Sequence, residues 1–72
     1  MTIDELAADL RTAVNMAPDG DRVVRIHLFG IRRAKELEGI PLKELIARAG
    51  IPPSYHTEVH KGKRLADHVT LR

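Results

Sequence analysis

The 72-residue sequence contains no cysteine and no tryptophan, and Phe29 and Tyr55 are its only aromatic residues. Without cysteine the chain has no disulfide, thiol nucleophile or thiolate metal ligand, so its stability must come from packing or association. Two aromatic residues are too few for the recognition of RNA by base stacking. A chain this short buries only about 60% of the surface that its unfolded form exposes, so we do not expect a two-domain enzyme with an enclosed cleft.

Long uncharged apolar segments are also missing. Asp4, Glu5 and Asp9 interrupt the apolar residues near the N-terminus, so this segment is neither a positively charged signal peptide nor a membrane span of about 20 residues. We therefore expect a cytoplasmic protein with no membrane partner. With 43% hydrophobic and 31% charged residues, the composition predicts one compact domain over residues 1–72.

The charged residues are unevenly distributed along the chain. Residues 1–21 contain one base against five acids (net −4), whereas residues 22–72 contain eleven bases against five acids (net +6). The later part of the chain is therefore suited to a polyanion and the first part is not. A basic run at Arg32, Arg33 and Lys35 is either a separate patch or the solvated face of a helix, partly neutralised by Glu36 and Glu38.

The first helix has a clear start and a clear end. Thr2 and Glu5 have the spacing of a capping box, in which each residue's side chain accepts a hydrogen bond from the other's backbone amide. Apolar residues then recur at spacings of three and four until Pro18 and Gly20 interrupt the pattern. We predict a helix that ends near Met16 and either packs on the core or forms a dimer contact.

The segment 22–39 fits two patterns. Apolar and polar residues alternate over 23–29, as in a strand, but apolar residues also recur at helical spacing at Val24, Leu28, Ile31, Ala34 and Leu37. We favour a helix over 23–37, because residues 32–38 have high helix propensity and a lone strand would lack a partner. We expect this helix to be the buried centre of the fold. Gly30 either permits the close approach of another backbone or is a tolerated weak point.

Glycine and proline divide the remaining chain into short helices. Gly39 suits a left-handed helix end, Pro41 suits a first helical turn, and Gly50 suits the end of a helix over 41–49. A fourth helix is predicted over 53–61, ended by Gly62, and a last helical turn over 65–69. The sequence thus predicts an all-α domain of four to five short helices, with a helix-turn-helix at about 42–61.

The segment 42–62 resembles the helix-turn-helix of small bacterial repressor-like DNA-binding domains. The positions that carry the resemblance are Leu45, Ala49, Gly50, Ile51, Val59 and Gly62. The chain departs from the pattern at Ile46, where alanine is usual, and at His56, where a branched apolar residue is usual. The preceding run 26–31 also resembles a family of bacterial helix-turn-helix-like proteins of unassigned function, and that resemblance implies no activity.

The resemblance implies that helix 53–61 is a recognition helix that enters the major groove of double-stranded DNA. It implies that the exposed side chains there are Ser54, Tyr55, Thr57, Glu58 and Lys61. Hydroxyl groups and a carboxylate suit base edges, as at Ser54, Thr57 and Glu58. The basic side chains expected to contact DNA phosphates are Lys43, Lys61, Lys63 and Arg64. The alternative is that these residues are ordinary solvated surface residues. A homodimer would double this footprint.

Some features of the same segment oppose DNA binding. Glu58 repels phosphates, helix 53–61 contains no arginine, and Pro52 and Pro53 remove two backbone donors at its start. The alternative function is a protein–protein interaction module of helix-turn-helix shape without a nucleic-acid ligand. Tyr55 is then an interface anchor, or else it is a lid on the small core.

The pattern of histidines and carboxylates predicts neither catalysis nor a cofactor. His56 and His60 have a spacing that binds a metal only when a third ligand converges, and the HExxH pattern is absent, so we expect one packing and one surface residue. His27 and His68 are isolated and are expected in the core or at its rim. There is no Ser/His/Asp grouping, glycine-rich phosphate loop or paired-carboxylate cleft. We expect no enzyme and no metal site.

Overall fold

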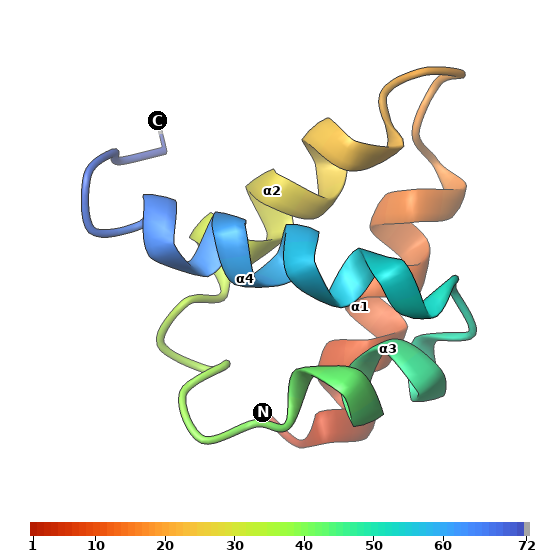
Figure 1. Cartoon of the computed structure of the whole chain (residues 1–72), viewed down its shortest axis with the longest axis horizontal. Coiled ribbons are helices and arrows are strands. Elements are labelled where there is room, and N and C mark those ends of the chain that lie inside the picture. The colour runs from red at the N-terminus through yellow and green to blue at the C-terminus, as the bar shows by residue number, and fades with distance from the viewer. Residues whose placement is uncertain (72) are drawn as a thin grey trace.

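A computed structural model describes residues 1–71 as an all-α fold without β-strands in that range (Figure 1). Its elements are α1 (Ile3–Asn15), α2 (Arg22–Arg32), α3 (Leu42–Ala49), a 3₁₀ turn η1 (Pro53–Tyr55) and α4 (His56–Leu65). The all-α prediction is confirmed, and the alternative of a strand over 23–29 is excluded. None of the helices within residues 1–71 has the length and apolar character needed to cross a membrane.

The capping box at the start of α1 is formed as predicted. The Glu5 amide donates to Thr2 Oγ1 at 3.1 Å, and the Thr2 amide donates to Glu5 Oε1 at 2.8 Å. Hydrogen bonds with Thr2 hold the pKa of Glu5 below its usual value. The bond with the Thr2 backbone has the larger effect and the bond with its side chain the smaller one. The helix ends at Asn15, with Met16 as its C-cap.

The four helices pack as two crossed pairs around one core. Figure 1 shows α4 lying across α2 and α3 lying beside α1, and these are the two most extensive helix–helix contacts. Helices α3 and α4, which are consecutive in the chain, share a smaller contact. The core residues are Leu6, Ala7, Leu10, Val14, Ile26, Phe29, Leu37, Leu45, Ile46, Ala49 and Val59. The orientation of α4 is therefore set mainly by α2.

The predicted helix over 23–37 is too long, and its predicted burial is only partly correct. Helix α2 ends at Arg32, and turns follow over residues 33–39, with Gly39 left-handed inside that segment rather than at a helix end. Leu37 is fully buried beyond the helix end. The chain must bring Leu37 into the core and reverse toward α3, and this tertiary requirement overrides the helix propensity of residues 32–38. Val24 at the start of α2 is 50% exposed, so α2 is not enclosed on all sides.

Gly30 and Gly62 form the crossing point of α2 and α4. A Cβ atom on Gly30 would lie 2.8 Å from the Gly62 Cα atom, and one on Gly62 would lie 2.5 Å from the His27 carbonyl oxygen. The close approach predicted at Gly30 is confirmed. The predicted helix end at Gly62 is wrong, because α4 continues through this glycine to Leu65. The separate helical turn over 65–69 does not form, and residues 66–68 are a turn at the end of α4.

Candidate nucleic-acid interface

The turn between α3 and α4 begins at Gly50. Gly50 has φ 73° and ψ 28°, and its amide donates to the carbonyl oxygens of Ile46 and Ala47, both at 3.1 Å. This left-handed conformation favours glycine, and it ends α3 where the sequence predicts. Ile51 then packs against the core, and Pro52 leads into the single turn of η1 before α4 starts. Two short helices are thus joined by a tight turn, as in a helix-turn-helix.

Four of the six positions that carry the sequence resemblance are buried, whereas Gly50 in the turn is exposed and Ile51 is half-buried. Leu45 and Val59 are fully buried, and Ala49 is 1% exposed. Ile46, one of the two departures from the usual pattern, is also a core residue. His56, the other departure, is half-buried, and its Nδ1 atom lies 3.0 Å from the Pro53 carbonyl oxygen. The unusual residues are therefore accommodated inside the motif.

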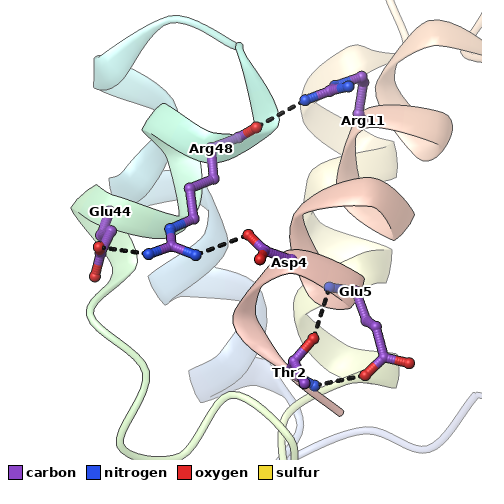
Figure 2. Close-up of polar contacts among 6 residues, drawn as sticks. All are labelled: Thr2, Asp4, Glu5, Arg11, Glu44 and Arg48. Atoms are coloured by element: carbon purple, nitrogen blue, oxygen red, sulfur yellow. Dashed lines mark hydrogen bonds and ion pairs between the residues drawn. The ribbon is translucent and has the colours of Figure 1, made fainter.

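Helix α1 holds α3 in place through arginine contacts that the sequence did not reveal. Arg11 Nε donates to the Ala49 carbonyl oxygen at 2.8 Å, and Arg11 Nη2 donates to the Arg48 carbonyl oxygen at 2.7 Å. Figure 2 shows Arg11 reaching toward Arg48, whose own guanidinium lies between Asp4 and Glu44. The bond to Asp4 at 2.7 Å, followed by that to Glu44, raises the pKa of Arg48. These contacts orient α3, and with it the turn that leads to α4.

The outward side of η1 and α4 carries four of the predicted contact residues. Ser54, Thr57, Lys61 and Arg64 are all exposed. Thr57, Lys61 and Arg64 follow one another at spacings of four and three, which places them along one helix face. His60 is exposed on the same helix, one residue before Lys61, although the sequence did not predict it as a contact residue. An exposed row of hydroxyl, imidazole and cationic groups can donate hydrogen bonds to bases and phosphates.

Glu58 is not an exposed residue of this face, contrary to the prediction. Its side chain is 16% exposed and lies between two partners, His27 Nε2 at 3.2 Å from Oε2 and Lys61 Nζ at 3.0 Å from Oε1. The hydrogen bond from Lys61, followed by that from His27, keeps the pKa of Glu58 below its usual value. The crossing of α4 over α2 brings position 58 beside His27, which sits at the rim of the core as predicted.

Tyr55, Lys63 and Lys43 lie in three different settings. Tyr55 is half-buried and packs against the core, so the prediction that it is exposed is wrong and its role is that of a lid. Lys63 is half-buried and lines an open groove together with Arg64. Lys43 is exposed near the start of α3, outside α4. The structure therefore groups only part of the predicted set on one face.

The basic run at the end of α2 is neutralised in part, at Arg32 and Arg33, and chiefly by Asp9, an acid distant in sequence. Asp9 Oδ2 accepts from Arg33 Nε at 3.0 Å and from Arg32 Nη2 at 3.3 Å. Glu36 Oε1 lies 3.8 Å from Arg33 Nη1, as their spacing of three residues suggests. Burial raises the pKa of Asp9, but the hydrogen bonds from Arg33 and Arg32 outweigh it and the pKa is lowered. Arg32 and Arg33 thus join α1 to the end of α2.

Residues 1–71 contain no group of three or more histidine and acidic side chains that could hold a metal ion. His56 and His60 have the spacing for two ligands on one helix, and His56 Nδ1 is directed to the Pro53 carbonyl oxygen.

A tight left-handed turn, two short helices and an exposed polar face on the second helix define a helix-turn-helix domain. A family model described as HTH-like domain matches residues 2–72, and the chain belongs to this family. No curated protein and no solved structure matches the chain.

Proposed function

We propose that this domain binds double-stranded DNA by placing α4 in the major groove, in the manner of a transcription regulator. The observation that carries the proposal is the exposed polar row on α4, directly after a helix-turn-helix turn in a chain of the HTH-like domain family. A second helix that presents short hydroxyl groups and cations outward suits a surface of base edges flanked by phosphates. The domain then acts by occupying DNA and not by catalysis.

The contact residues divide by their chemistry. Ser54, Thr57 and His60 carry groups that suit base edges, since hydroxyls donate to or accept from several bases. Lys61, Lys63, Arg64 and Lys43 carry the charges that suit phosphates. Glu58 no longer has a place among the base contacts, because both of its oxygens have partners within the domain. The same pairing reduces the repulsion between this acid and a phosphate backbone.

The alternative function, a protein–protein module, has less support on this face. For this alternative Tyr55 was a candidate interface anchor at the start of the helix, and Tyr55 instead packs against the core. Apart from Leu65 at its last position, which is 38% exposed, the exposed residues of α4 are polar or charged, whereas the centres of protein interfaces are depleted of charged residues. The geometry therefore favours a polyanionic ligand.

The test compares two double variants with the same change in charge. Lys61→Gln/Arg64→Gln removes two bases from the exposed face of α4, and Arg22→Gln/Arg25→Gln removes two exposed bases from α2. Neither Arg22 nor Arg25 forms an ion pair with any residue in the range 1–71. Binding to a fluorescent mixed-sequence duplex is measured by anisotropy at several salt concentrations.

We expect the α4 variant to bind more weakly at low salt and to lose about 1.8 from the slope of log K against log salt, since each phosphate contact contributes roughly 0.9. The α2 variant should keep the wild-type slope. Equal losses of affinity and slope in both variants would show that only the net charge of the domain matters. That result would contradict a DNA-facing α4. No binding of the wild type at low salt would exclude the proposal altogether.

A further inference from the structure

Thr57 is an exposed residue near the start of α4 whose hydroxyl proton is already in use. Its Oγ1 atom donates to the Ser54 carbonyl oxygen at 3.0 Å. A carbonyl oxygen can only accept a hydrogen bond, so the proton in this bond belongs to Thr57. A hydroxyl group has one proton and two acceptor lone pairs. To an external ligand, Thr57 therefore offers a hydrogen-bond acceptor and a methyl group, and no donor.

His56, the preceding residue, is engaged in the same way. Its Nδ1 atom lies 3.0 Å from the Pro53 carbonyl oxygen, so Nδ1 carries the proton of this contact. In a neutral imidazole ring the other nitrogen, Nε2, is then an acceptor. The first two side chains of α4 thus both direct their donors to carbonyl groups of η1.

The major groove of DNA distinguishes such an acceptor from a donor. Its only hydrogen-bond donors are the exocyclic amino groups, N6 of adenine and N4 of cytosine, whereas guanine and thymine present acceptors. The phosphate oxygens are acceptors as well. Thr57 can therefore form a hydrogen bond with adenine or cytosine while it keeps its bond to Ser54. A bond to guanine, thymine or a phosphate would require that the internal bond first be broken.

We propose that Thr57 is a specificity-determining residue that accepts a hydrogen bond from the exocyclic amino group of one base in the major groove. This inference rests on the proposed DNA contact of α4. Thr57 is the second residue of α4, and the N-terminal residues of a recognition helix are those that contact base edges. Every base pair has one such amino group, so the contact selects the strand that carries adenine or cytosine.

Thr12 on α1 provides a matched control. It is exposed, and its Oγ1 atom donates to the Ala8 carbonyl oxygen at 3.0 Å, the distance found between Thr57 and Ser54. Thr12→Val and Thr57→Val therefore lose the same kind of internal bond and keep a branched side chain of similar shape. Circular dichroism checks that both variants keep their helices. A difference in DNA selectivity between them then reports the place of Thr57 on α4.

The first experiment selects binding sites for the wild-type chain and both variants from a pool of random-sequence duplexes at low salt. We expect the wild type and Thr12→Val to restrict one position to adenine or cytosine on one strand. Thr57→Val should lose this restriction at that position alone. It should also bind the wild-type site about fivefold more weakly, because one hydrogen bond is lost.

The second experiment removes the amino group from the DNA. Purine replaces the adenine, or 2-pyrimidinone the cytosine, at the selected position, and binding is measured by fluorescence anisotropy. Thr57→Val measures the effect of the weaker base pair in the modified duplex, since the amino group has no partner in that variant. The wild type and Thr12→Val should each lose about fivefold more affinity than Thr57→Val does.

The outcomes separate this inference from the proposed function. No binding of the wild type to any duplex at low salt would overturn both. Binding with the same site selection in the wild type and Thr57→Val would overturn the role of Thr57 and leave the DNA contact of α4 in place. A guanine or thymine restriction that Thr57→Val loses would show that the hydroxyl donates, and a thymine restriction that it keeps would show a methyl contact. Either result would overturn the inference.

Discussion

Arg11 is the only base among residues 1–21, and its guanidinium accounts for much of the link between α1 and α3. The last carbonyl groups of a helix have no partner within the helix. Arg11 donates to the carbonyl oxygens of Arg48 and Ala49, so a side chain from another helix satisfies two acceptors beside the Gly50 turn. The planar fork of donors suits this geometry, which lysine does not reproduce.

We predict that Arg11→Ala lowers the free energy of unfolding by about 1 kcal/mol, since two hydrogen bonds from a charged donor are lost at a partly exposed site. Arg11→Lys should recover less than half of this loss. Arg22→Ala is the control, because Arg22 is exposed and its side chain makes no ion pair within residues 1–71. Urea denaturation measures all three variants. A loss no larger for Arg11→Ala than for Arg22→Ala would contradict this role.

At the scale of the elements, the crossing of α2 and α4 depends on two glycines. Gly30 and Gly62 are both buried within helices, where glycine is normally unfavourable by about 1 kcal/mol relative to alanine. The close backbone contact explains their presence, since a Cβ atom at either position would meet backbone atoms at 2.8 Å or less. Backbone atoms cannot move aside as a flexible side chain can, so the helices would have to separate.

Gly62→Ala should therefore destabilise the domain by about 2 kcal/mol, the opposite sign to the gain expected from helix propensity alone. His60→Ala in the same helix is the control, and it should change the stability by no more than about 0.5 kcal/mol because His60 is exposed. Thermal and urea unfolding both report the difference. A stabilised Gly62→Ala variant would show that the two helices do not approach this closely.

At the scale of the whole molecule, ion pairs and a hydrogen bond join elements that are distant in sequence. Asp9 connects α1 to the end of α2, and Glu58 connects α4 to His27 on α2. The pKa values of Glu5, Asp9 and Glu58 are all lowered in the folded chain. A carboxyl with a lowered folded pKa stabilises the fold above its unfolded pKa, and this contribution is lost as the pH falls through the folded pKa.

We predict that the free energy of unfolding decreases as the pH falls below the ordinary carboxyl values of 4.5 for Glu and 3.8 for Asp. Asp9→Asn should cost about 0.5 kcal/mol at pH 7, a small value because solvent screens the pair. The difference between this variant and the wild type should shrink below pH 3.8, where Asp9 becomes protonated in the wild type. Asp19→Asn, at an exposed acid without an ion pair within residues 1–71, should match the wild type throughout.

Several parts of the candidate site were predictable because they depend on neighbouring residues. The Gly50 turn and the burial of Leu45 follow from local spacing, and the resemblance to a helix-turn-helix implied the burial of Val59 and the exposure of Thr57 and Lys61. Other parts depend on residues far away in sequence. Glu58 is directed away from the exposed face toward His27, and no pattern within α4 predicts a partner 31 residues earlier in the chain.

The sequence by itself determined where α1 begins, where α3 ends and which residues form most of the core, because caps, turns and helical spacing act over a few residues. Only the tertiary structure decided that α2 ends at Arg32, that α4 passes through Gly62 and that Val24 faces outward. Each of these outcomes is set by another element: the turn that buries Leu37 or the close crossing of α2 and α4. Packing between distant segments overrides local propensity there, because the burial of apolar side chains such as Leu37 stabilises the fold and helix propensity is a weaker preference.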